Sequence, residues 1–147
     1  MKEIERKFLV ASNAWRAGAR GTRYRQGYLS ISKICVVRVR TMGRRAALTI
    51  KGASKGMTRD EYEYAVPLKD ANEMLDRLCG ERIVDKTRYE IRFKGHTWEV
   101  DVFHGRHRGL VIAEIELKSE AERFEKPAWL GREVTGQRRY DNSALAS

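Results

Sequence analysis

The sequence predicts an α+β fold that is mainly β, in which eight antiparallel strands close into a barrel-shaped tunnel with a polar lumen and a few flanking helices. Apolar and polar residues alternate along eight stretches of the chain, and tight turns join most of these stretches. Charged residues also recur at every second position. Because successive side chains of a strand point to opposite faces, this spacing gives the sheet one charged face and one apolar face.

The first predicted strand, residues 3–10, shows the pattern in its simplest form. Apolar residues alternate with polar ones, and one face carries Glu3, Glu5 and Lys7. Two neighbouring carboxylates repel each other and are stable only in open water or beside a cation. For an isolated strand, a solvated outer face would be the simpler interpretation. The pattern of charges in the other predicted strands is needed to choose between the two.

The same alternation predicts the remaining strands. Residues 11–22 are small, basic and glycine-containing, which indicates a loop with a helical turn. Further strands are expected at residues 24–31, 34–41, 45–52, 57–66, 83–93, 96–103 and 110–118. Two-residue turns such as Gly43-Arg44 and Lys94-Gly95 connect neighbours, as in an antiparallel meander that can close on itself.

Three helices are expected. Residues 69–78 have an amphipathic pattern with Asp70 as the predicted N-cap. A capping-box pattern predicts a short helix that opens at Ser119, and a further short helix is expected over residues 140–146. Together with these helices, two loop tryptophans are expected to cover the apolar outer face of the barrel: Trp15 and Trp129.

Composition limits the class of protein. The 147 residues, 41% of them hydrophobic, suit one domain spanning residues 1–147. A net charge of +10 favours anionic partners, which include nucleic acid, phosphates and anionic lipid. The chain lacks a recognised nucleic-acid motif and an aromatic stacking ladder, so no specific nucleic acid is predicted.

Other features concern the cellular compartment. The start of the sequence, residues 1–3, leads directly into a charged strand without an apolar stretch, and no apolar run approaches the length of a membrane span. Cys35 and Cys79 are far apart in apolar surroundings, which favours two buried, reduced thiols over a disulfide. We therefore predict a cytoplasmic protein without a membrane partner.

Charges spaced two residues apart recur on most of the predicted strands. The pairs are Glu3/Glu5, Arg38/Arg40, Glu61/Glu63, Lys86/Arg88, Glu99/Asp101 and Glu114/Glu116. Each pair alone is weak, because amphipathic strands often carry alternate charges. Together they predict that the charged face lines the lumen of the barrel.

The predicted lumen contains a basic and an acidic set. The basic residues are Lys7, Arg38, Arg40, Lys51, Arg59, Lys86 and Arg88. The acidic residues are Glu3, Glu5, Glu61, Glu63, Glu99, Asp101, Glu114 and Glu116. Arginine and lysine suit a chain of phosphates, whereas carboxylates suit hard cations such as Mg²⁺ and Mn²⁺. A polyphosphate with bound metal would neutralise both sets.

These residues resemble the CYTH superfamily of triphosphate tunnel metalloenzymes. The ExExK signature of that family matches Glu3, Glu5 and Lys7, and later motifs follow in the family's order across essentially the whole chain. The later matches are Arg38 and Arg40, then Lys51, then Arg59, Glu61 and Glu63, then Lys86 and Arg88, then Glu114 and Glu116. The resemblance is strongest to short, single-domain bacterial members.

The resemblance implies an eight-stranded tunnel that hydrolyses inorganic tripolyphosphate, or a related triphosphate, with Mg²⁺ or Mn²⁺. It implies that metal is held by Glu3, Glu5, Glu114 and Glu116, with Glu61, Glu63 or Asp101 contributing directly or through water. The phosphates are expected to contact Lys7, Arg38, Arg40, Lys51, Lys86 and Arg88, with Arg59 in the same basic set.

The role of Tyr28 is left open by the sequence. It matches a tyrosine of the family and is a candidate proton acceptor, with a pKa lowered by Lys7 or Lys51, which are the other residues predicted to act in catalysis. Alternatively, it only packs or hydrogen-bonds at the tunnel mouth. The chain also departs from short relatives at Gly136-Gln137, where they often have an acidic residue.

Rival functions also remain. A class IV adenylate cyclase or a thiamine triphosphatase would use the same fold, and a non-catalytic module would bind polyphosphate or nucleotide without turnover. An outer sheet face can additionally form a homodimer contact.

Overall fold

A computed structural model describes residues 2–146 of the chain. The strands are β1 (Lys2–Val10), β2 (Gly21–Ile31), β3 (Cys35–Met42), β4 (Arg45–Gly52), β5 (Thr58–Ala65), β6 (Ile83–Phe93), β7 (His96–Phe103), β8 (Val111–Glu116) and β9 (Leu130–Glu133). The α-helices are α1 (Leu68–Arg77) and α2 (Asn142–Ala146). Short 3-10 turns lie at Ala14–Arg16, Gly105–His107 and Arg138–Tyr140.

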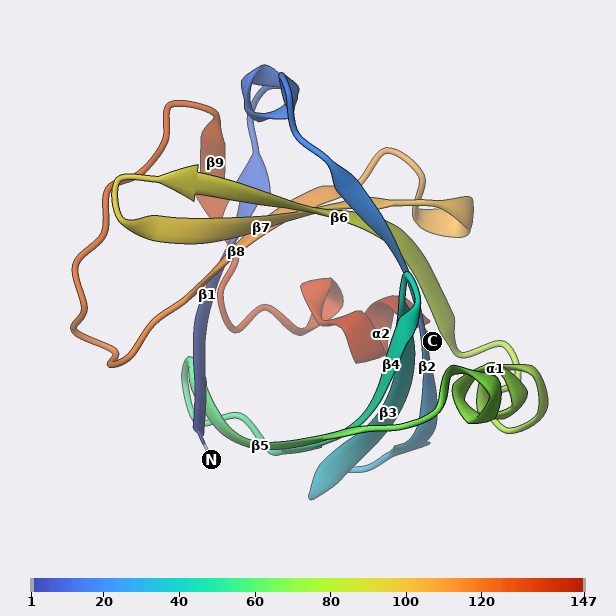
Figure 1. Cartoon of the computed structure of the whole chain (residues 1–147). Coiled ribbons are helices and arrows are strands. Elements are labelled where there is room, and N and C mark those ends of the chain that lie inside the picture. Colours follow the sequence, from blue (N-terminus) through green and yellow to red (C-terminus); the bar gives the residue numbers. More distant parts are fainter. Residues whose placement is uncertain (1, 147) are drawn as a thin grey trace.

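The first eight strands form the predicted closed antiparallel barrel. They are ordered β5-β4-β3-β2-β6-β7-β8-β1, and β1 pairs back onto β5 to close the ring. Figure 1 looks into this ring and shows the strands arranged around the C-terminal segment of the chain. All the pairings are antiparallel, so the eight predicted strands and the barrel are confirmed.

The ninth strand, β9, was not predicted. It pairs with the second half of β1, whereas β5 pairs with the first half. A Cβ atom at Gly131 would lie 3.0 Å from the carbonyl oxygen of Leu9, so the glycine allows the two backbones to approach closely. A strand of four residues that contains glycine has too little alternation to be recognised from sequence.

Two hydrophobic clusters cover the outside of the barrel. The larger one is centred on Trp98 and includes both predicted tryptophans, which are 4% (Trp15) and 8% (Trp129) exposed. The second lies between α1 and the outer face of β3 and β4, where Leu75 packs near Val39. The expectation that helix α1 and the tryptophans cover the apolar face is therefore confirmed.

Helix α2 lies elsewhere than expected. Its Leu145 and Ala146 pack in a third cluster with Val84 and Ile112, which share the strand face of the charged lumen residues. Figure 1 accordingly shows α2 within the outline of the barrel and not on its outside. The expected outer location was wrong, because the apolar partners of α2 are inner-face residues near one end of the tunnel.

Two predictions about helix termini were wrong. Helix α1 begins after Pro67 without a side-chain cap, and Asp70 lies inside its first turn, where a carboxylate still favours the helix dipole. No helix forms at Ser119 within the described chain. There the carboxylate of Glu122 accepts a hydrogen bond from the backbone nitrogen of Lys118 at 2.6 Å, which stabilises a loop.

Cys35 and Cys79 are free thiols, as predicted, but only Cys79 is buried, whereas Cys35 is half-buried. Across residues 2–146, no helix has both the length and the apolar character that crossing a membrane requires.

Gly27 provides a test of the packing between β2 and the segment after α1. A Cβ atom there would lie 2.5 Å from the Sγ atom of Cys79 and 2.9 Å from Cδ1 of Ile83. We expect Gly27→Ala to lower the free energy of unfolding by about 1–3 kcal/mol, as overpacking of a core does. Urea denaturation measures this change.

The matched control is Gly52→Ala on β4. An added Cβ there would meet its nearest neighbour, Cβ of Asp60, at an ordinary distance of 3.5 Å. Its stability should stay within about 0.5 kcal/mol of the parent. Equal stability of the two variants would contradict the close packing at Gly27.

Candidate active site

The register of the barrel places charged inner-face residues of neighbouring strands side by side. Glu5 of β1 lies opposite Glu116 of β8, and Lys7 lies opposite Glu114. Glu114 lies in turn opposite Glu99 of β7. Residues that are more than a hundred positions apart in the sequence therefore form one continuous charged wall.

A cavity of about 210 Å³ lies inside the barrel. Its cationic lining residues are Lys7, Arg38, Arg40, Lys51, Arg59 and Arg88. Its acidic lining residues are Glu3, Glu5, Glu61, Glu63, Glu99, Glu114 and Glu116, and Asn142 of α2 completes the lining. Most of the predicted site residues are thus brought together, while Lys86, Asp101 and Tyr28 are not part of this lining.

A wider opening gives access to the cavity from one side. It has a volume of about 880 Å³ and shares Glu3, Glu5, Lys7 and Arg59 with the inner cavity. Further cations border it, namely Lys33, Arg138 and Arg139. Its basic residues can attract an anion towards the cavity.

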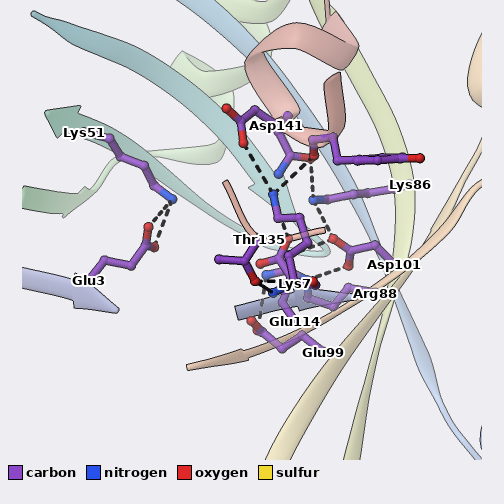
Figure 2. A network of polar contacts seen from close by, with 12 residues as sticks. Glu3, Lys7, Lys51, Lys86, Arg88, Glu99, Asp101, Glu114, Thr135 and Asp141 are labelled. Carbon is purple, nitrogen blue, oxygen red and sulfur yellow. Dashed lines mark hydrogen bonds and ion pairs between the residues drawn. The ribbon is translucent and has the colours of Figure 1, made fainter. Parts of the chain in front are cut away.

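Lysines pair with several of the cavity carboxylates. The Nζ atom of Lys51 lies 2.9 Å from Glu3 and 3.2 Å from Glu61. Further along β1, the Nζ atom of Lys7 lies 3.7 Å from Glu114, and both side chains line the cavity (Figure 2). Burial raises the pKa of Glu3, but Lys51, a hydrogen bond with Glu61 and the charge of Arg59 together outweigh burial and hold that pKa at about 2.

Glu5 differs from these paired carboxylates. Burial raises the pKa of its carboxyl group to about 8, and the neighbouring charges of Glu114 and Glu3 add to this rise. The oxygen of a carboxylate is a hard donor that suits a divalent cation, and a cation here would offset the repulsion. The chemistry of these donors therefore fits a metal ion.

A complete metal site is not present in the arrangement described. Within residues 2–146, no three acidic, histidine or cysteine side chains lie close enough together to hold a metal ion. Six of the seven predicted ligands nevertheless line the cavity, with lysines or arginines beside several of them: Glu3, Glu5, Glu61, Glu63, Glu114 and Glu116.

Asp101 is held by cations. It is 1% exposed, and its carboxylate lies 2.7 Å from the Nζ atom of Lys86. It also accepts two hydrogen bonds from Arg88, at 2.7 and 2.8 Å. Lys86 is fully buried and also donates to Oδ1 of Asn142 at 3.1 Å. These contacts connect Lys86 to α2 and fix the orientation of Arg88.

Arg38 and Arg40 have unsatisfied donors. Their Nε–H groups are buried, and neither finds a hydrogen-bond partner in the described part of the chain. Their remaining contacts are long, at 3.4 Å from Arg38 to Thr49 and 3.4 Å from Arg40 to Glu63. Burial, with Arg38 and Arg88 nearby, lowers the pKa of Arg40 to about 10. Buried orphan donors of this kind favour binding of an anion.

Tyr28 lies under α2. It is 2% exposed and packs in the inner apolar cluster with Phe103 and Leu145. Burial raises the pKa of Tyr28, and the opposing effects of Arg38 and more distant cations do not overcome it. The expectation that neighbouring lysines lower this pKa was therefore wrong.

Residues near the C-terminus complete the surroundings of Lys7. Its Nζ atom donates to the carbonyl oxygen of Tyr140 at 3.2 Å and lies 3.9 Å from Asp141 (Figure 2). Its backbone nitrogen donates to Oγ1 of Thr135 at 2.9 Å. The sequence reasoning missed Thr135, Asp141 and Asn142. No periodic signal in the sequence indicates that this segment faces the lumen.

A closed antiparallel barrel with a mixed cationic and acidic lumen defines a class of tunnel proteins suited to a polyanion together with a cation. The chain belongs to the CYTH domain family, whose model matches residues 1–144.

Close relatives carry a named activity. An inorganic triphosphatase of Acetivibrio thermocellus is 52% identical over 98% of this chain and 92% of the relative. An inorganic triphosphatase of Nitrosomonas europaea is 39% identical over 99% of this chain and 97% of the relative. The crystal structure of an inorganic triphosphatase is 38% identical, with a TM-score of 0.70, and covers 97% of this chain and 96% of that chain.

Replacing Asp101 tests the buried ion pairs. In Asp101→Asn, Lys86 stays buried without its anionic partner, and Arg88 keeps only its contact of 3.2 Å to Glu99. We expect the free energy of unfolding to fall by about 3–5 kcal/mol, as it does when one member of a buried pair is removed. Chemical denaturation in parallel with the parent protein measures the loss.

Asp85→Asn on the neighbouring strand is the control. Asp85 pairs with Arg23, whose side chain is 60% exposed. Such a surface pair contributes about 0–1 kcal/mol. A loss in Asp101→Asn no larger than in this control would refute the structural role given to Asp101.

Proposed function

We propose that this protein hydrolyses inorganic tripolyphosphate with Mg²⁺ or Mn²⁺ and releases orthophosphate. The observation that carries the proposal is the pair of buried, unpartnered Nε–H donors of Arg38 and Arg40 in a cavity lined by cations and carboxylates. A phosphate chain supplies acceptors for such donors, and a divalent ion balances the carboxylates. The named activity of the full-length relatives supports the same substrate.

The basic residues of the cavity would hold the phosphates. They are Lys7, Arg38, Arg40, Lys51, Arg59 and Arg88. Arginine offers two parallel donors to phosphate oxygens, whereas lysine offers a point charge. Lys86, which the sequence analysis included in this set, does not line the cavity and instead contacts Asp101 and Asn142 of α2. Lys7 and Lys51 would neutralise charge that develops on the phosphate during the reaction.

The acidic residues would hold the metal. Glu3, Glu5, Glu114 and Glu116 are the proposed ligands, and the Glu61 and Glu63 carboxylates would contribute directly or through water. A divalent ion bound there would neutralise phosphate charge and make a nearby water molecule a stronger nucleophile. We do not include Asp101 among the proposed metal ligands, because its carboxylate is already paired with Lys86 and Arg88.

In the reaction, water attacks a terminal phosphorus atom and the bond to the bridging oxygen breaks, which leaves orthophosphate and pyrophosphate. The barrel contributes positioning and neutralisation of charge, which dominate catalysis of phosphoryl transfer.

We propose that Tyr28 packs under α2 and does not accept a proton in the reaction. Its raised pKa and its buried place in the inner apolar cluster disfavour proton acceptance.

We also propose a cytoplasmic location, no specific nucleic-acid or membrane partner, and a homodimer formed through an outer sheet face. Tyr62 and Tyr64 on the outside of β5 are 48% and 59% exposed and would suit such a contact. Light scattering of the purified protein would establish its oligomeric state.

A substrate panel tests the function. Purified protein receives tripolyphosphate, thiamine triphosphate or ATP with Mg²⁺, Mn²⁺ or excess chelator, and orthophosphate is measured. We expect release mainly from tripolyphosphate and its loss with chelator. Preference for thiamine triphosphate, or formation of cyclic AMP from ATP, would identify a different enzyme of the same fold. Tight tripolyphosphate binding without any turnover would identify a binding module.

Glu114→Gln tests the carboxylate set. The variant keeps the shape of the side chain but removes the charge that faces Lys7 at 3.7 Å. We expect kcat/KM for tripolyphosphate to fall about 100- to 1000-fold, the typical cost of removing one essential electrostatic group. Circular dichroism verifies that the barrel is folded.

Glu125→Gln in the exposed loop serves as the control and should retain full activity. Comparable activity of the Glu114 variant and this control over a range of metal concentrations would disprove the assignment of Glu114.

A further inference from the structure

Tyr24 lies between two arginines of the cavity. The centre of its ring is 5.2 Å from the guanidinium carbon of Arg40 and 4.9 Å from that of Arg88. Arg40 belongs to β3 and Arg88 to β6, the two strands that flank β2. Tyr24 is half-buried and borders a second opening of about 490 Å³, which it shares with Arg88.

The two arginines are held differently. Arg88 makes two short hydrogen bonds to Asp101 and a contact of 3.2 Å to Glu99. Arg40 has a contact of 3.4 Å to Glu63, and its Nε–H finds no partner within residues 2–146. The ring of Tyr24 is therefore the main additional contact that fixes the guanidinium group of Arg40.

The placement of the ring has an electrostatic consequence. The guanidinium groups of Arg40 and Arg88 repel each other, and a ring face attracts each of them through its negative quadrupole. Without the ring, Arg40 would be free to move away from Arg88 and to pair closely with Glu63. Binding of phosphate would then first have to reverse that movement.

We propose that Tyr24 is a positioning residue for the substrate, which keeps Arg40 and Arg88 close to each other and oriented so that both can receive one phosphate group. This inference rests on the proposed function in one respect, since it assumes that the two arginines meet phosphate. Tyr24 is absent from the lining of the inner cavity, so it acts through the arginines and does not touch the substrate.

Replacement of Tyr24 tests this role. In Tyr24→Leu both ring contacts are lost, and we expect KM for tripolyphosphate to rise roughly 5- to 30-fold, the effect of two cation–π contacts. We expect kcat to change less than about 3-fold, because the loss affects binding of the ground state and the transition state alike. Tyr24→Phe keeps the ring face and should restore KM to within about 2-fold of the parent.

Two comparisons separate positioning from a general loss of structure. Tyr64→Leu makes the same change on the exposed outer face of β5 and should leave KM unchanged. In an Arg40→Leu background, Tyr24→Leu should have a clearly smaller effect than in the parent, because part of its effect passes through Arg40. Thermal unfolding of all variants accompanies the kinetics.

Calorimetric binding of tripolyphosphate without metal separates this inference from the proposed hydrolysis. If the parent binds tripolyphosphate but does not hydrolyse it, hydrolysis fails as the function, and the dissociation constants of the variants still test Tyr24. Unchanged or tighter binding by Tyr24→Leu, equal loss in Tyr24→Phe, or full additivity with Arg40→Leu would overturn the inference. A parent protein that does not bind tripolyphosphate would overturn both.

Discussion

Charge placed inside a closed barrel has to find a partner, and this constraint determines most of the structure around the lumen. A charge removed from water is costly unless an opposite charge or a hydrogen bond compensates it. Asp101 meets this requirement with Lys86 and Arg88, and Glu3 meets it with Lys51. Two other features meet it only in part: the buried Nε–H groups of Arg38 and Arg40 lack an acceptor among the described residues, and Glu5, which shares a hydrogen bond with Glu114, lies among carboxylates that raise its pKa. A phosphate chain with a divalent cation supplies both missing partners.

The same constraint divides the inner face into two parts. Lys86 and Asp101 satisfy each other, are 0% and 1% exposed, and support α2 through Asn142. Lys86 and Asp101 therefore have a structural role in the wall of the barrel. Arg38 and Arg40 in the cavity keep long or incomplete contacts, such as 3.4 Å from Arg40 to Glu63. Side chains with incomplete contacts are available to a ligand, so we assign them to binding. We assign Lys86 and Asp101 to the support of the cavity wall.

Much of the barrel and of its charged lumen was predictable, because both follow from a local rule. The alternation along a strand identifies which residues share a face, so the eight barrel strands and the inward set that includes Glu3, Lys7 and Arg38 could be read directly. Strand β9 was missed because its four residues contain glycine and show little alternation. The short helix expected at Ser119 failed because Glu122 uses its carboxylate to stabilise a loop.

By itself, the sequence determined the strand face on which the paired charged residues lie, the balance of cations and carboxylates, and the resemblance to a family. The tertiary structure decided which charges are neighbours, because the register between strands and the closure of β1 onto β5 are long-range properties. It alone placed Asp101 between two cations, turned α2 towards the inner face, and buried Tyr28 with a raised pKa. It also set the ring of Tyr24 between Arg40 and Arg88, a contact across three strands that no pattern along one strand encodes.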